Sequence, residues 1–150
     1  MPDQEDAVKL QIVRIVLKDL SFETPMGQDV FKRDWQPEYK VKLDVTRAGI
    51  ADGLWEVVMW VTVTASLDGD IAYVIEAQHA GVFKADGLEA GSEPLRRLLT
   101  VDAPTQIFPY LREAVENVAA KGGFPSFGLQ PPDLEGWYAS GHEPEPSDAK

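Results

Sequence analysis

The sequence predicts an α+β fold, in which an antiparallel sheet is followed by one long helix. Strand patterns fill residues 8–83, a two-residue turn signal, Asp68-Gly69, joins two of them, and a helical pattern follows only after Thr105. Strands that all precede the helix along the chain are typical of α+β folds rather than of alternating α/β folds. At 150 residues and 44% hydrophobic residues, a single core suffices for the whole chain.

Four segments have strand patterns. Residues 8–17 carry apolar side chains on both faces, so this strand is expected to be at least partly covered on both sides. Residues 39–45 alternate between apolar and charged side chains, and the odd positions of residues 54–67 form an apolar face within a β-branched run. Asp68-Gly69 tolerates positive φ, so the strand over residues 70–83 should return antiparallel.

A helix is expected from about Thr105 to Lys121. Apolar residues recur there at helical spacing, Pro109 pre-sets φ for the first turn, and Gly122-Gly123 end the run. The preceding residues 92–99 are expected to be a short helical or irregular stretch. Residues 134–139 could add one or two helical turns as a short C-terminal helix, although Gly136 costs about 1 kcal/mol in a helix interior.

The two ends of the chain hold most of its net charge of −11. Residues 1–6 contain three acids and no base, and residues 133–150 contain five acids and one lysine, so the ends account for seven of the eleven negative charges. We therefore expect an acidic, flexible N-terminus over residues 1–7, one folded domain over residues 8–139 and an acidic, disordered tail over residues 140–150.

Several function classes are disfavoured by composition and motifs. A net charge of −11 opposes binding to a phosphate backbone, so no nucleic-acid partner is expected. The chain has no cysteine, its two histidines form no close pair, and its glycines match no phosphate-binding loop, so no metal, cofactor or catalytic activity is expected. No apolar run is long enough for a membrane span and no secretory signal begins the chain, so we expect a cytoplasmic protein without direct membrane insertion.

Aromatic residues gather outside the strongest strand patterns. One group falls in the first long loop and another at the ends of the predicted helix and beyond it; they are Phe22, Phe31, Trp35, Phe108, Tyr110, Phe124, Phe127, Trp137 and Tyr138. Each could simply close one end of the core. Together they could line an apolar groove that binds many apolar sequences rather than one shaped ligand.

Several segments resemble the SecB family of bacterial protein-export chaperones. They occur in the order and spacing of the family and span roughly residues 10–132. The most specific are residues 15–25 and the run Asp-Trp-Gln-Pro-Glu at residues 34–38; the others are residues 55–58, 61–65, 76–83, 108–110, 112–113 and 123–125.

The resemblance implies a SecB-like chaperone domain with a four-stranded antiparallel sheet and a long helix, assembled as a homotetramer that is a dimer of dimers. It implies a protein without catalysis that binds non-native precursor proteins, keeps them competent for translocation and delivers them to the SecA ATPase. Two alternatives stay open: a SecB-like chaperone dedicated to one client, such as an antitoxin, or a carrier of small apolar ligands.

The resemblance also assigns roles to residues. SecA would dock on Asp19, Glu23, Val74 and Glu76, which combine acidic and apolar side chains. The groove for unfolded substrates would be lined by Phe22, Trp35, Phe108, Tyr110, Phe124 and Phe127. Subunit packing would involve Ile75, Ala77 and His79. The C-terminal end departs from the family pattern, so residues 133–139 need not form the helix that flanks the groove in better-known members.

Overall fold

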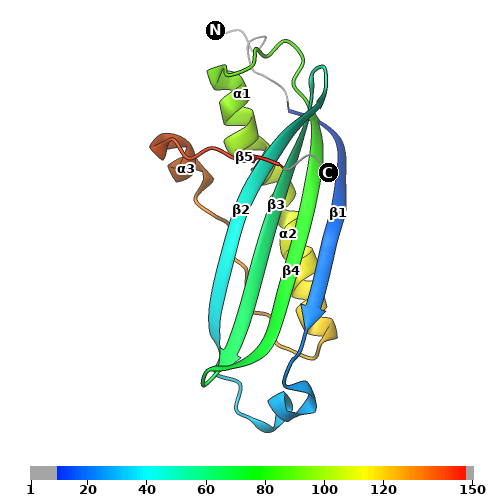
Figure 1. The fold of residues 1–150 in the computed structure, drawn as a ribbon, viewed down its shortest axis with the longest axis vertical. Coiled ribbons are helices and arrows are strands. Elements are labelled where there is room, and N and C mark those ends of the chain that lie inside the picture. Colours follow the sequence, from blue (N-terminus) through cyan, green and yellow to red (C-terminus); the bar gives the residue numbers. More distant parts are fainter. Residues whose placement is uncertain (1–9, 148–150) are drawn as a thin grey trace, which may run out of the picture.

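A single five-stranded sheet with one long helical stretch on one face makes up the protein (Figure 1). The computed structural model describes residues 10–147. The strands are β1 (Gln11–Glu23), β2 (Glu38–Ala51), β3 (Leu54–Leu67), β4 (Asp70–Lys84) and β5 (Glu145–Pro146), and their order in the sheet is β1-β4-β3-β2-β5. The four long strands pair antiparallel, whereas β5 pairs parallel to β2. The predicted α+β class is therefore confirmed, with five strands rather than four.

The hairpin between β3 and β4 forms where the sequence predicts it. Asp68 and Gly69 have φ values of 48° and 87°, the left-handed conformation that a two-residue hairpin turn requires. This turn fixes the register, in which Met59 lies opposite His79 and Val63 opposite Ile75. Odd-numbered residues of both strands consequently share the face that the helix covers.

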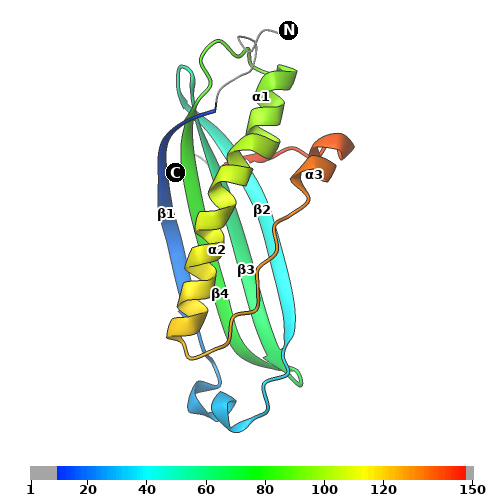
Figure 2. The ribbon, with the colours of Figure 1, turned by 180° about the vertical axis from the view of Figure 1, so that it is seen from behind.

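The helix begins earlier than the sequence predicts. Ser92 caps α1 (Glu93–Arg97) by accepting a hydrogen bond from the Leu95 amide at 3.4 Å, and the chain then continues through the π-helical segment η3 (Leu98–Asp102) into α2 (Ala103–Lys121). Figure 2 shows these segments as one continuous rod along the sheet. Because the rod starts at Glu93, Pro109 lies inside α2, and its predicted place in the first turn is wrong.

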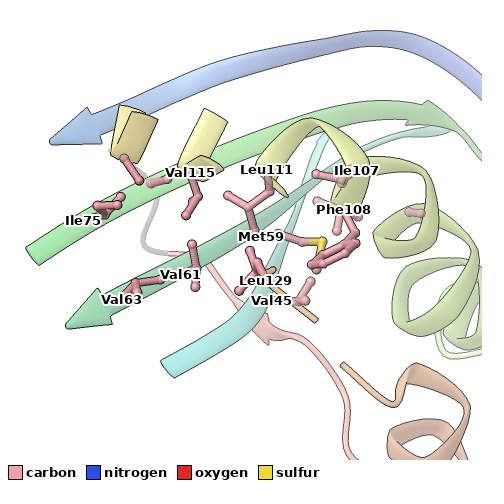
Figure 3. Close-up of a cluster of buried hydrophobic side chains, with 14 of the residues drawn as sticks. Val45, Met59, Val61, Val63, Ile75, Ile107, Phe108, Leu111, Val115 and Leu129 are labelled. Carbon is pink, nitrogen blue, oxygen red and sulfur yellow. The ribbon is translucent and has the colours of Figure 1, made fainter. Parts of the chain in front are cut away.

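The core lies between the odd face of the sheet and α2. Ile107, Leu111 and Val115 recur at helical spacing and pack over the odd positions of β3 and β4, as Figure 3 shows. Removing such apolar side chains from water is the main source of stability for a domain of this size.

Two segments that the sequence left outside regular structure belong to strands. β1 extends to Glu23, so Phe22 lies in a strand and not in the following loop, which contains the short helix η2 (Gly27–Lys32). The predicted tail begins at residue 140, but Pro144 is buried and Glu145–Pro146 pair with β2. This segment is rich in proline and charge, so its sequence has no strand pattern. Its pairing with β2 depends on tertiary contacts. Residues 1–7 and 148–150 lie outside the described residues.

The short C-terminal helix α3 (Leu134–Ser140) is present despite Gly136. The Asp133 side chain caps α3 by accepting a hydrogen bond from the Gly136 amide at 3.0 Å. A Cβ at residue 136 would collide with that carboxylate, so glycine gives the capping side chain the space it needs.

Candidate functional site: an aromatic cluster and an acidic sheet face

An aromatic cluster closes the end of the molecule near the β3–β4 hairpin. Phe124 is at its centre, with ring centroids 4.8 Å from Tyr73, 5.1 Å from Trp35, 5.4 Å from Phe31 and 6.1 Å from Phe22. Strand, loop and post-helix residues meet here because β1 and α2 end at the same end of the sheet (Figure 1). Stacked and tilted ring pairs at these separations add to the energy of burial.

The outer wall of the aromatic cluster faces solvent. Phe124 is only 5% exposed, whereas Phe31, which stacks on it, is 52% exposed. Trp35 and Phe22 are half-buried. The cluster therefore closes the core on its inner side and presents an apolar, π-rich surface on its outer side.

A carboxylate anchors the extended segment that follows α2. Glu116 accepts hydrogen bonds from the amides of Gly128 and Leu129, both at 2.9 Å, and from the Ser126 hydroxyl. These charge-assisted bonds hold residues 126–129 against the helix, shortly after Phe124 in the chain. Sequence reasoning missed Glu116, because one acid on a helix among 25 acids gives no signal of its own.

Three of the six predicted groove residues meet in the aromatic cluster: Phe22, Trp35 and Phe124. Phe127 stacks instead on Tyr39, with ring centroids 5.0 Å apart. Phe108 is buried in the core beside Met59 (Figure 3), and Tyr110 lies on the exposed side of α2, 51% exposed. Phe127, Phe108 and Tyr110 therefore lie outside the aromatic cluster.

Tyr73 joins the aromatic cluster from β4, although the sequence did not single it out. It is fully buried, and its hydroxyl has no hydrogen-bond partner among the described residues. Burial raises the pKa of this phenol. The odd-numbered position of Tyr73 in β4 was the available signal, since the odd face of this strand points toward the helix.

The four residues predicted to dock SecA share the face of the sheet opposite α2. The register pairs Glu23 with Val74 directly and places Asp19 and Glu76 on the same face of the neighbouring strands β1 and β4. Asp19, Glu23 and Glu76 are exposed, and in the described part of the chain none of them forms a side-chain ion pair or hydrogen bond. We call this set the acidic face; none of its three carboxylates lies within ion-pair distance of a cation in the described part of the chain.

The residues predicted for subunit packing are inside the protomer. Ile75 and Ala77 are at most 1% exposed beneath α2, and His79 is 7% exposed, with its ring 6.3 Å from that of Tyr110. This burial argues against direct contact of Ile75 and Ala77 with a second subunit. The strand pattern assigned their face correctly, but that face is the one that α2 covers.

Strand β1 forms one edge of the sheet, and its apolar side chains are largely exposed. Ile12, Val13, Leu17 and Leu20 are all exposed, and Leu17 lies opposite His79 on the side of the sheet where α2 runs. Tyr110 lies on the same side, next to His79. An edge strand has unpaired backbone amide and carbonyl groups, and with such exposed apolar side chains it tends to pair with another chain.

Within residues 10–147, no group of three or more metal-ligating side chains is close enough to bind an ion. No helix in the same range is both long and apolar enough to cross a bilayer.

Comparison with known proteins gives one family by sequence and a shared fold by structure. The family model "Preprotein translocase subunit SecB" matches residues 3–144. The protein-export protein SecB of Hahella chejuensis is 43% identical over 126 residues, covering 84% of this chain and 78% of that protein. The SecB-like chaperone Rv1957 of Mycobacterium tuberculosis, solved with a ChAD peptide from the Rv1956 HigA1 antitoxin, shares the fold with a TM-score of 0.65 at 15% identity, covering 85% of this chain and 90% of that one. Because the family model matches nearly the whole length of this chain, the chain belongs to the SecB family.

Proposed function

We propose that this protein is a cytoplasmic export chaperone that binds non-native precursor polypeptides, keeps them competent for translocation and delivers them to SecA without catalysing a reaction. The observation that carries this proposal is the aromatic cluster, whose outer wall holds the exposed Phe31 and the half-buried Trp35 while its inner ring, Phe124, is anchored in the core. Membership of the SecB family supports it.

Exposed aromatic rings suit a client that has not folded. They bind apolar side chains through area and stacking rather than through a fixed pattern of hydrogen bonds, so many sequences can be accepted. Binding the unfolded chain in preference to the native one draws the client away from folding by mass action. The high like charge of the chaperone keeps molecules that display such a surface from associating with one another.

The test of this proposal is the refolding of a slow-folding precursor in the presence of the protein. At near-stoichiometric concentrations the precursor should refold several-fold more slowly, and Phe31→Ser should weaken this effect because Phe31 can be removed without opening the core. Ile50→Ser is the matched control, since Ile50 is equally exposed but lies at the opposite end of β2. Unchanged refolding with the wild-type protein would refute the proposal.

The acidic face is the proposed docking site for SecA. In the described part of the chain Asp19, Glu23 and Glu76 form no ion pair, and Val74 supplies an apolar side chain on the same face. A basic partner would be steered to such a surface, with an association rate that falls as salt is added.

We also propose that four chains assemble. The surface that supports this is the open edge of β1 with its exposed Val13 and Leu17, together with Tyr110 of α2. The buried residues Ile75, Ala77 and His79 would then affect assembly only indirectly, by positioning α2 and β1.

A chaperone dedicated to one client, such as an antitoxin, is the second candidate. It is favoured by the shared fold with the SecB-like chaperone that was solved with an antitoxin peptide. A dedicated chaperone would leave the refolding of unrelated precursors unchanged, so the refolding experiment separates the two candidates.

A further inference from the structure

The C-terminal segment of residues 142–147, here called the strap, crosses the free edge of β2. The Ser147 amide donates to the Arg47 carbonyl at 2.7 Å, and the Ser147 hydroxyl donates to Thr46 Oγ1 at 2.7 Å. His142 Nε2 lies 3.3 Å from Asp44 Oδ1. The strap thus occupies the place along β2 where another extended polypeptide could pair, and Figure 1 shows β5 beside β2 there.

The strap also forms one wall of a pocket beside α1. The pocket has a volume of about 290 Å³ and is lined by Arg47, Trp55, Leu95, Arg96, Leu99 and Thr100 from the fold, with Glu143 and Pro144 from the strap. Thr100 is 1% exposed, and its hydroxyl has no partner among the described residues. A buried hydroxyl without a partner is costly, and Thr100 is one of the residues that line this pocket.

The strap is held on the fold by few contacts. β5 is two residues long, and one of them is Pro146, which has no amide hydrogen to donate. Glu143 lies 3.7 Å from Arg96, and both side chains keep contact with solvent, so this ion pair contributes little. A segment held in this way can leave its site at small cost.

The place that the strap occupies has a definite chemistry. The edge of β2 offers the Arg47 carbonyl to an amide of an extended chain, Arg96 offers a guanidinium to a carboxylate, and the pocket offers Trp55 and Leu95 to an apolar side chain. Extended peptides commonly add to sheet edges through their main chain and fill neighbouring pockets with alternate side chains.

We propose that the strap is an internal competitor, which occupies a docking site for an extended segment of a non-native polypeptide and leaves when such a segment binds. The preferred segment places an acidic side chain next to an apolar residue, as Glu143 and Pro144 do. The inference rests on the proposed function, because the displacing ligand is a chaperone client.

A disulfide lock tests the strap. The chain has no cysteine, so the double variant Thr46→Cys with Ser147→Cys would contain the protein's only thiols, at side chains now in hydrogen-bond contact. That contact places the two sulfur atoms within reach of a disulfide after small adjustment. Oxidation locks the strap on β2 and reduction releases it, and each single cysteine variant controls for the substitutions alone.

The probe is a fluorescein-labelled peptide with the sequence of residues 141–150, measured by fluorescence anisotropy. The reduced double variant should bind it, and the oxidised form should bind at least about tenfold more weakly, since locking removes the open state that binding requires. Equal binding by the oxidised and reduced forms would overturn the inference.

A second variant loosens the strap without a cross-link. Ser147→Ala removes the hydroxyl hydrogen bond to Thr46 and should strengthen binding of the peptide, whereas Glu145→Ala should not, because in the described part of the chain the Glu145 side chain forms no hydrogen bond or ion pair. Equal peptide affinity in the two variants would count against the strap.

Competition separates this inference from the proposed function. Reduced, carboxymethylated lactalbumin, which stays unfolded, should displace the peptide from the reduced double variant. If the reduced variant slows precursor refolding but the unfolded protein does not displace the peptide, the strap inference fails alone. If neither effect occurs, the proposed function fails with it.

Discussion

Single side chains on the acidic face decide whether this surface is a docking site. Glu76→Lys reverses one of three carboxylates that form no ion pair among the described residues, and should weaken association with SecA by about tenfold or more at low salt, because attraction becomes repulsion. The binding constant can be measured by surface plasmon resonance at several salt concentrations. Glu89→Lys, an equal charge reversal in the exposed loop after β4, is the control and should have a much smaller effect. Equal affinity of wild type and Glu76→Lys would remove the acidic face as the site.

His79 gives a second prediction at this scale, concerning pH. Its burial beneath α2 lowers its pKa below the ordinary value of 6.5, and the nearby Glu113 carboxylate opposes this only in part. Below 6.5 the unfolded chain therefore binds more protons than the folded chain, and the free energy of unfolding falls as the pH decreases. Above 6.5 the contribution of this residue is constant.

His79→Leu should remove that contribution. Urea unfolding at fixed protein concentration, at about pH 7.5 and about pH 5.5, would show a smaller loss of stability on acidification in the variant than in the wild type. If both proteins lose the same stability, His79 is not the group responsible.

At the scale of elements, the strand and hairpin patterns were the most predictable part of the fold. The strand over residues 54–67 has the bounds the sequence predicts, because an apolar face, a β-branched run and a turn signal coincide there. The helix start was not predictable from Pro109, since the capping residue Ser92 had already begun the rod. β5 escaped prediction because only contact with β2 makes residues 145–146 a strand.

The site was predictable to a lesser degree for the same reason. Phe22, Trp35 and Phe124 could be named from composition and family resemblance, but Tyr73 and Phe31 join them only through the way β4 and η2 pack at that end. Phe108 is also a phenylalanine, but it is not part of the aromatic cluster, because its position on α2 points it into the core.

The close approach of α2 to the sheet depends on a glycine in β4. A Cβ at Gly81 would lie 2.5 Å from Phe83 Cε2 and 3.2 Å from Ile107 Cγ1, and both of those side chains are fully buried. Gly81→Ala should therefore destabilise the protein by about 1–3 kcal/mol through overpacking, measured by urea unfolding.

Another strand glycine provides the control for this prediction. At Gly49 in β2 the added Cβ would make ordinary contact with the Trp55 ring at 3.8 Å, so Gly49→Ala should be neutral or slightly stabilising. Equal effects of the two substitutions would show that glycine flexibility, and not helix approach, determines the cost.

For the molecule as a whole, the net charge and the apolar edge of β1 have opposite effects on association. The open edge of β1 favours association, whereas a net charge of −11 per chain repels further copies. A closed assembly of four chains would cover the edge and carry a formal charge of about −44, which favours a defined oligomer over continued aggregation.

Solution mass tests this balance. Four chains of 16.6 kDa would give about 66 kDa by light scattering at micromolar concentration, and Leu17→Asp should shift the mass to dimer or monomer by placing a charge on the edge of β1. Val41→Asp, at an exposed position on β2, should keep the wild-type mass because β4 and β3 separate β2 from the β1 edge. A wild-type mass near 17 kDa would exclude the assembly, and a tetramer unaffected by Leu17→Asp would move the interface away from β1.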